Sequence, residues 1–360
     1  MSLARINILT ANAHSNAWAF NCPLLAARSA CRTHGMDLRF FFREKPGLFD
    51  GDILLVNSSF FRFTWKNDKG RIFKCLETAA SGGMKVFWND LTDSTWSPHF
   101  EVLPIVTGFL KNQVLVDRTR YLEPSKTGRI SIDFFDKLYN SGEKESQYRA
   151  PLAEELPKIN VSWNTSLENY GRTRYSLMNK LKRKFRPWLH QWLEEKLEPS
   201  FIAPGRPRPV DLSCRVGCRQ SRPAVVAHRK AILALLEGRG IPSGPLPRAD
   251  YFDELERSKV GISPFGMGEL CYRDYETMLA GAALLKPDMG HLETWPSLFI
   301  PGETYCPHKW DLSDFEEKLD ALLADDELRE KLACAAQRVY REALPKDVFA
   351  ARLAKLLKVS

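Results

Sequence analysis

The sequence predicts an α/β protein made of two successive halves, each with a parallel sheet covered by helices. Three observations support this class. Strand patterns alternate with helix patterns in residues 1–120, the alternation weakens in residues 117–209, and a second alternating series begins at Val210. Such alternation is typical of βαβ units and parallel sheets. A chain of 360 residues is long enough for two domains.

Four short apolar runs in the first half have the length and composition of buried strands. Residues 22–35 and 70–83 have helical patterns, and each pattern ends at glycine, as helices often do. The predicted strands cover residues 5–11, 36–42, 52–58 and 84–90.

The middle of the chain is less regular. Residues 172–197 form a strongly basic helical pattern interrupted by Pro187, and the proline-rich residues 198–209 have the composition of a linker. Basic residues mixed with large apolar ones over residues 172–192 suit an anionic membrane surface. They equally suit a solvated basic face around a packed apolar stripe.

The second series resembles the first in its alternation. Its strand patterns cover residues 210–218, 259–265 and 282–287, and its helical patterns cover 223–240, 273–281, 312–344 and 347–358. We therefore expect domains at residues 1–168 and 210–345, joined by a basic segment and linker at 169–209 and followed by a terminal helix at 346–360.

Charge and composition narrow the partners and the compartment. A net charge of +8 favours anionic partners such as phosphates, nucleic acid or an anionic membrane. The basic residues gather in one helical segment without a nucleic-acid-binding motif, so nucleic acid is not expected. The dispersed cysteines form no CxxC pair, which argues against zinc and for reduced thiols. No signal peptide or apolar span is evident, so a cytoplasmic protein is expected.

A segment with two glycines and two glutamates lies between two predicted strands of the second half. Gly266 and Gly268 follow the end of a strand, where open parallel sheets bind ligands, and glycine permits close backbone approach. The next helix begins near residues 271–273, and a helix N-terminus favours an anion. Arg273 in its first turn opposes the helix dipole, which makes sense if a diphosphate lies nearby.

The two glutamates, Glu269 and Glu276, are about two helical turns apart and can share one face. A carboxylate accepts two hydrogen bonds, so one glutamate suits sugar hydroxyls and the other suits ribose hydroxyls. The alternative is an ordinary surface helix with solvated charges, because glycines before a helix are a weak motif. Lys286 and Asp288 end the following strand on the same side of the sheet, where they either meet a phosphate or are structural.

These motifs carry a family resemblance. "SPFGMGELCYRDYE" and "ETMLAGAALLKP" resemble the donor-binding segment of GT-B glycosyltransferases, especially bacterial enzymes with exostosin-like carboxyl-terminal halves. The resemblance covers roughly Val210 to Leu344. It implies two Rossmann-like domains facing a cleft. It also implies transfer of a sugar from a nucleotide-activated donor to a glycan or lipid-linked acceptor, as in the synthesis of bacterial surface polysaccharide or glycoconjugates.

The resemblance also implies roles for particular residues. Glu276 binds the nucleotide ribose, and the loop from Gly266 to Gly268 lines the sugar diphosphate. The glutamate spacing is one residue shorter than is usual in retaining members, so stereochemistry does not carry over. The first strand of the donor domain leads to basic phosphate ligands, which here are Arg215, Arg219 and Arg222.

Polar clusters in the first half mark the predicted acceptor side. Residues 12–16, 57–59 and 89–95 each follow a predicted strand, so they are expected to converge on one crevice. Inverting transfer uses a general base, and the candidates in order of preference are Asp93, Asp90 and His14. The alternative role of the two aspartates is capping of a helix, and that of His14 is stabilisation of a local turn.

No metal ion or other cofactor is required, because a helix dipole and arginines can stabilise the leaving diphosphate. The Asp50-Gly51-Asp52 motif precedes its strand and is interpreted as a turn. Two other functions stay open. One is a transferase that uses a CMP-activated acidic sugar, and the other is a catalytically silent protein that binds a nucleotide or glycan.

Overall fold

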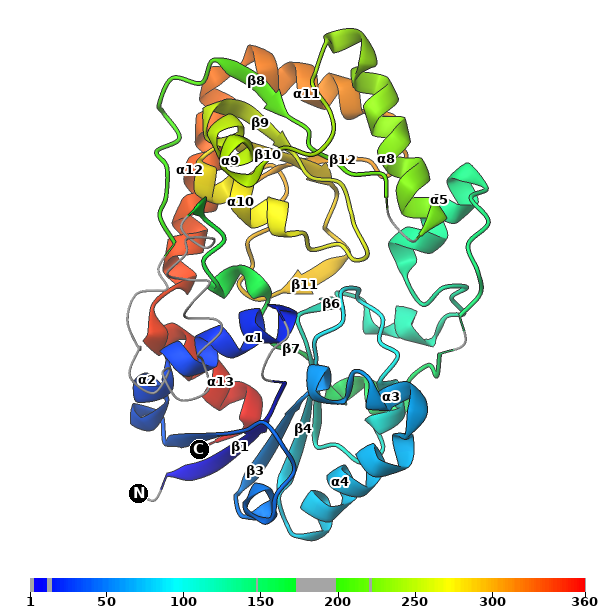
Figure 1. The fold of residues 1–360 in the computed structure, drawn as a ribbon, viewed down its shortest axis with the longest axis vertical. Helices are drawn as coiled ribbons and strands as arrows, with labels where there is room; N and C mark the ends of the chain where they lie inside the picture. The colour runs from blue at the N-terminus through cyan, green and yellow to red at the C-terminus, as the bar shows by residue number, and fades with distance from the viewer. Residues whose placement is uncertain (1–2, 12–14, 147, 173–198, 220–221, 360) are drawn as a thin grey trace.

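The structure is a computed structural model that describes residues 3–11, 15–146, 148–172, 199–219 and 222–359. It contains two parallel sheets, one above the other, with helices around each (Figure 1). The prediction of two successive α/β halves is therefore confirmed. His14 and residues 173–198, which include most of the predicted basic segment, lie outside the described residues.

The lower sheet has six parallel strands in the order β2-β1-β3-β4-β5-β7. Its central strand β3 is buried along its whole length, as its sequence ILLVN requires. The four strands expected in the first half all form, whereas β5 and β7 were not predicted. The strands are β1 (Ala4–Leu9), β2 (Met36–Phe41), β3 (Ile53–Asn57), β4 (Lys85–Asp90), β5 (Gly108–Lys111) and β7 (Ile159–Val161).

Helices pack on this sheet through apolar faces. In α4, the Asp68 side chain accepts a hydrogen bond from the backbone N–H of Arg71 and caps the helix start. The chain leaves α4 at Gly82, as the glycine stop predicted. The helices are α1 (Ser15–Ala26), α2 (Arg28–Thr33), α3 (Thr64–Asn67) and α4 (Lys69–Ser81).

The upper sheet has four parallel strands in the order β12-β10-β9-β8. The helix α10 ends at Gly281, whose φ of +69° is the left-handed conformation that favours glycine. The strands are β8 (Val210–Ser213), β9 (Ser258–Ile262), β10 (Ala283–Pro287) and β12 (Cys306–His308). The helices are α8 (Pro223–Leu236), α9 (Arg248–Arg257), α10 (Tyr272–Ala280), α11 (Phe315–Ala324) and α12 (Asp326–Ala343).

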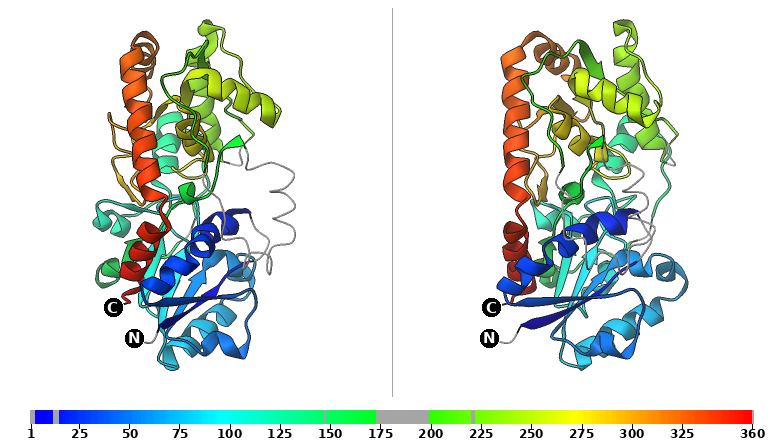
Figure 2. Two further views of the ribbon diagram at one scale, coloured as in Figure 1. Left: turned by 90° about the vertical axis from the view of Figure 1, so that its left-hand side faces the viewer. Right: turned by 60° about the vertical axis from the view of Figure 1, so that its left-hand side comes forward.

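The two halves lie one above the other in every view (Figure 1 and Figure 2), and β6, β11 and α5 are among the described elements that join them. β6 (Gln113–Leu115) pairs antiparallel with β11 (Leu292–Thr294). α5 (Ile130–Tyr139) lies against α8, and Glu143 just beyond α5 accepts a hydrogen bond from the Ala224 backbone N–H at 3.0 Å. The chain therefore reaches the upper half at α5 and returns to the lower sheet at β7 before the linker.

The last helix, α13 (Lys346–Leu357), returns to the lower half. Phe349 packs edge-on against Trp163, with ring centroids 5.3 Å apart, and Leu353 joins the same buried cluster as Ile6 and Ile8. The Arg352 guanidinium donates to the carbonyl of Val161 at 2.7 Å. Among the described residues, no helix is both long and apolar enough to cross a membrane.

Candidate active site between the two sheets

The glycine loop of the upper half and the loop after β4 of the lower half are in contact. A Cβ on Gly268 would lie 1.5 Å from the carbonyl oxygen of Asp93, so only glycine fits there. The Gln113 side chain donates to the same carbonyl at 2.5 Å, and the Arg129 guanidinium donates to the carbonyl of Met267. The two segments that the sequence assigns to donor and acceptor therefore meet at one junction.

This contact makes a prediction about the glycines. Gly268→Ala should lower the free energy of unfolding by about 1–3 kcal/mol, because the methyl group displaces backbone rather than a flexible side chain. Gly266→Ala is the matched control, since its Cβ would meet nothing closer than 3.5 Å. Urea denaturation compares the two variants, and equal stability would contradict the packing of Gly268 on Asp93.

Glu269 lies inside the junction. Its side chain is fully buried and accepts hydrogen bonds from Gln113 at 3.1 Å and from Ser131 at 3.2 Å. Burial raises its pKa. In this structure Glu269 therefore joins the halves through β6 and the first turn of α5, rather than facing open space as the predicted contact with sugar hydroxyls would require.

Glu276 lies on α10 and is nearly buried, with 6% of its surface exposed. It accepts a hydrogen bond from the Tyr251 hydroxyl at 2.8 Å, and the Arg248 guanidinium lies 3.9 Å away. The carboxylate is thus held by residues of α9. Burial, and then the charge of Glu276, raise the pKa of Tyr251, which keeps its hydroxyl as a donor.

Two arginines lie close to the glycine loop. Arg273, in the first turn of α10, donates to the carbonyl of Arg215 at 2.6 Å. Arg229, on α8, donates to the carbonyl of Gly217 at 2.7 Å, and its other terminal nitrogen lies 3.5 Å from the Cβ position of Gly266. Neither guanidinium forms an ion pair with a residue that the structure describes. Sequence reasoning missed Arg229, because it occurs within an apolar helical pattern.

The other predicted phosphate ligands are placed differently. Arg215 is paired with Glu254, with Nε 3.0 Å from a carboxylate oxygen, and Arg222 is paired with Glu143 at 3.0 Å. Arg219 is exposed. Two of these three arginines therefore have acidic partners within the protein.

Lys286 is fully buried at the end of β10. Its ammonium lies 2.7 Å from the backbone carbonyl of Glu269 and 3.1 Å from the Asp274 carboxylate. Asp274 also accepts from the backbone N–H of Cys271 at 2.8 Å, so it occupies part of the N-terminus of α10. The Asp274 carboxylate thus balances the charge of Lys286. The hydrogen bond from Lys286 to the Glu269 carbonyl holds the end of the glycine loop.

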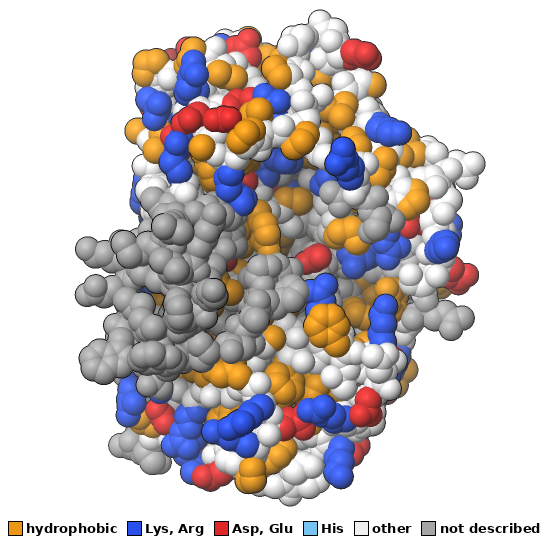
Figure 3. Space-filling model, in the orientation of Figure 1, with side chains coloured by type: hydrophobic (Ala, Val, Ile, Leu, Met, Phe, Trp, Pro, Cys, Tyr) orange, Lys and Arg blue, Asp and Glu red, His pale blue; other side chains and the backbone are white. Residues whose placement is uncertain are grey.

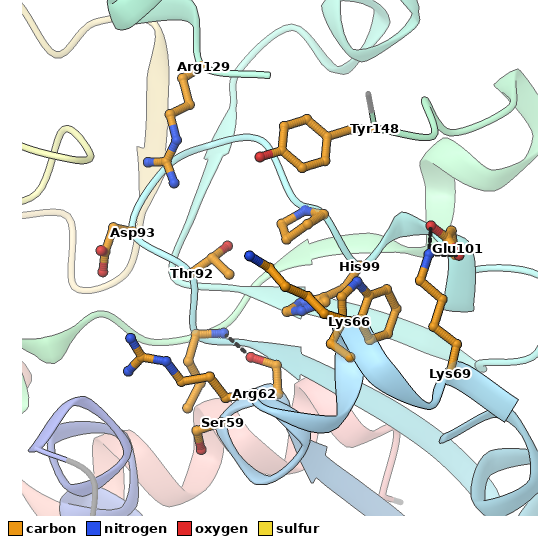
Figure 4. A pocket seen from close by; sticks show the side chains of 14 residues that line it. Ser59, Arg62, Lys66, Lys69, Thr92, Asp93, His99, Glu101, Arg129 and Tyr148 are labelled. Atoms are coloured by element: carbon orange, nitrogen blue, oxygen red, sulfur yellow. Dashed lines mark hydrogen bonds and ion pairs between the residues drawn. The ribbon is translucent and has the colours of Figure 1, made fainter. Parts of the chain in front are cut away.

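A cavity of about 560 Å³ opens on the lower side of the junction. Figure 4 shows Asp93 and Arg129 at one side of it, with Lys66, His99 and Tyr148 directed toward the same space. Asp93 is exposed there, beyond the end of β4. The first-ranked candidate base from the sequence thus lines a cavity beside the glycine loop.

His99 is held in this cavity wall by Asp90. The Nδ1 atom of His99 lies 3.0 Å from Oδ1 of Asp90, and the Lys111 ammonium lies 2.8 Å from Oδ2. Burial alone would raise the pKa of Asp90, but Lys111 and His99 hold it well below its usual range. An ionised Asp90 accepts a hydrogen bond from Nδ1–H of His99, which leaves Nε2 as the nitrogen with a lone pair.

Asp90 itself is out of reach of a substrate. Its carboxylate is fully buried and also accepts from the hydroxyl of Thr92 at 2.8 Å. No helix begins beside it, so it does not cap one. The polar clusters after β3 and β4 do converge, but Asn57 and Asn89 form a buried 2.9 Å hydrogen bond instead of facing the cavity. The Asp50 carboxylate, before β3, pairs with Arg5 at 2.9 Å.

Comparisons with known proteins agree with this arrangement. Residues 231–358 match the family model described as glycosyl transferase-like. The carboxyl-terminal half is thus glycosyltransferase-like, and two Rossmann-like domains facing each other are the GT-B arrangement. The expected likeness of this half to a glycosyltransferase is confirmed. No curated protein matches the chain in sequence.

Three solved structures are similar in arrangement. T4 phage β-glucosyltransferase in complex with UDP-glucose is 11% identical over 100% of both chains, with a TM-score of 0.43. A glycosyltransferase from Rickettsia africae ESF-5 is 11% identical over 100% of both chains, with a TM-score of 0.44. The pneumococcal O-GlcNAc transferase GtfA, in complex with UDP and GlcNAc, is 11% identical over 85% of this chain and 56% of that one, with a TM-score of 0.38. These likenesses do not identify the donor or the acceptor.

Proposed function

We propose that the chain transfers a sugar from a nucleotide-activated donor to an acceptor hydroxyl, with His99 as general base. The observation that carries this proposal is the Asp90–His99 pair, which opens on a cavity lined by Asp93, and Asp93 touches the glycine loop. A base, an acceptor-sized space and a donor loop thus adjoin one another. Base-assisted attack of this kind belongs to inverting transfer.

The upper half binds the donor in this proposal. Glu276 accepts hydrogen bonds from the ribose hydroxyls, which suits a carboxylate already fixed by Tyr251. Arg229 and Arg273 stabilise the diphosphate as the bond to the sugar breaks. They are suited to this because Arg229 reaches the glycine loop and Arg273 lies in the first turn of α10, where a helix N-terminus also favours an anion.

The lower half activates the acceptor. Nε2 of His99 takes the hydroxyl proton while the oxygen attacks the anomeric carbon, and Asp90 stabilises the imidazolium that forms. Lys111 keeps Asp90 ionised throughout. Asp93 binds a hydroxyl of the donor sugar or acceptor at the junction, and it is the alternative base.

The biological setting in the proposal is synthesis of a surface polysaccharide or glycoconjugate, with a glycan or lipid-linked acceptor. Contact of residues 172–192 with an anionic membrane stays a prediction, because residues 173–198 lie outside the described part of the chain. A CMP-activated donor remains the alternative, and it would leave one of the two arginines at the loop without a phosphate.

Nucleotide binding tests the donor assignment. A thermal-shift screen against UDP, GDP, CDP, TDP and CMP should single out one nucleotide, which stabilises by about 2.7 kcal/mol at 100 times its dissociation constant. Glu276→Ala should then weaken that nucleotide by about 2–3 kcal/mol, the range for hydrogen bonds to a charged group.

Tyr251→Phe is the control for this experiment. It removes the hydroxyl that bonds Glu276 but leaves the carboxylate in place. The nucleotide affinity of Tyr251→Phe should therefore fall less than that of Glu276→Ala, because the carboxylate that binds the ribose is retained. If both variants lose affinity equally, Glu276 serves only to hold α9, and the ribose assignment is rejected.

A further inference from the structure

We propose that the acceptor carries a phosphoryl group, which the cavity binds through Lys66 and Arg129 beside His99. The inference rests on the proposed function, because it names the class of acceptor for that site. It begins from the charges of the cavity lining, which do not balance. Four basic side chains line the cavity, Arg62, Lys66, Lys69 and Arg129, against two acidic ones, Asp93 and Glu101.

One of these cations is already neutralised. The Lys69 ammonium lies 2.7 and 2.8 Å from the two carboxylate oxygens of Glu101, which is a complete ion pair. Lys66 forms no ion pair with any residue that the structure describes. Setting aside the Lys69–Glu101 pair, and also Arg62, which has other contacts within the protein, leaves Lys66 and Arg129 facing Asp93, so the cavity keeps an excess of positive charge.

The remaining cations come from different elements and converge. Lys66 lies on α3, one turn after Arg62, and Arg129 immediately precedes α5. Figure 4 shows the side chains of Lys66 and Arg129 extending toward one space from different sides, with the Tyr148 hydroxyl directed toward the same space. Basic side chains also flank the hollow between the two halves in the space-filling view of Figure 3. Charges brought together from separate elements indicate a bound anion, since they otherwise repel one another.

Arg129 has donors left for a ligand. A guanidinium has five N–H donors in a planar fork, and the described contact of Arg129 uses one terminal nitrogen on the Met267 carbonyl. That contact also fixes the guanidinium at the glycine loop. A phosphoryl group suits such a fork together with an ammonium better than a neutral sugar does, because a phosphate monoester carries up to two charges and three acceptor oxygens.

The position of the bound anion beside His99 gives the anion a role in placing the acceptor. His99 and Lys66 line the same cavity, so an acceptor anchored by its phosphoryl group places a neighbouring hydroxyl at Nε2 of His99. Trp65 also lines the cavity and offers an apolar surface to the sugar ring. The acceptor class is therefore a phosphate-bearing sugar or glycan, whether free or on a lipid carrier.

Inorganic phosphate is the probe that tests this inference. Titration calorimetry on the full chain should detect phosphate binding, and Lys66→Gln should weaken it about tenfold, the loss of one charge-assisted hydrogen bond. Lys69→Gln is the matched control, because it removes the same charge from the same cavity but from a lysine paired with Glu101. It should weaken phosphate less than about threefold. Lys66 is exposed, so its replacement leaves the fold intact.

The same experiment distinguishes phosphate binding in the cavity from nucleotide binding at the donor site. Phosphate should still bind to Glu276→Ala and in the presence of saturating nucleotide, because the two sites are distinct. Equal weakening by both lysine variants, displacement of phosphate by nucleotide, or no phosphate binding would each overturn the inference. Phosphate binding without any transferase activity would reject the proposed function alone, and transfer to a neutral acceptor without phosphate binding would reject this inference alone. Binding of phosphorylated soluble sugars, compared with binding of phosphorylated lipid-linked sugars, then distinguishes the two sources of the phosphoryl group.

Discussion

His99→Gln should slow sugar transfer by about 10²–10⁴-fold, the usual cost of removing a general base. Glutamine retains a polar side chain of similar reach but cannot take a proton from the acceptor hydroxyl. Donor affinity should be unchanged, because His99 lies on the lower side of the junction and Glu276 on α10 of the upper half. Initial rates at saturating donor, with nucleotide affinity measured in parallel, give both quantities.

Asp93→Asn separates the two candidate bases. If His99 is the base, Asp93→Asn should lose less activity than His99→Gln, since it retains one hydrogen-bonding oxygen. A reversed order, with near-normal transfer by a folded His99→Gln protein, would move the base role to Asp93. Normal transfer by both variants would favour a retaining mechanism, in which no base on the acceptor side is needed.

Lys111→Met should lower the free energy of unfolding by about 3–5 kcal/mol, because it leaves the Asp90 carboxylate buried without its partner. Lys111 and Asp90 are both fully buried and 2.8 Å apart. The matched control is Lys69→Met, whose pair with Glu101 is partly exposed. Exposed pairs contribute about 0–1 kcal/mol. Urea denaturation measures both, and similar losses would contradict the importance of the buried pair.

The pH dependence of this effect has a definite sign. The pKa of Asp90 is depressed in the folded protein, so its contribution is present above the unfolded pKa of about 3.9 and is lost as the pH falls. Without Lys111 the depression is smaller. The stability difference between wild type and Lys111→Met should therefore be full at neutral pH and should narrow below about pH 4.

The strands of the fold were predictable where burial is continuous. β1 to β4 are apolar runs bounded by helical patterns, and each forms close to its expected limits. β5 and β7 were missed because they are short and lie in a stretch that is rich in turns and short 3₁₀ helices. They form strands because β5 pairs with the edge of β4 and β7 then pairs with β5, a tertiary effect that local sequence does not carry.

The candidate site was predictable in part. The sequence predicted site roles for Asp93 and the glycine loop, and the structure places them in contact. It gave no sign of His99, because a loop without periodicity separates this residue from Asp90. Glu269 looked available for a ligand until its partner Gln113 was located, 156 residues away in the chain. Long-range partners of this kind decide whether a charged residue is free to bind.

The packing of α13 limits how the two halves can be exchanged between proteins. The last helix contributes Phe349 and Leu353 to the hydrophobic core of the amino-terminal half, although it follows the upper half in the chain. A chimera that replaces everything after residue 209 would remove this helix and open an apolar groove beside Ile6 and Ile8. Donor specificity would therefore have to be transplanted as an internal cassette that ends before Lys346, with the original carboxyl terminus retained.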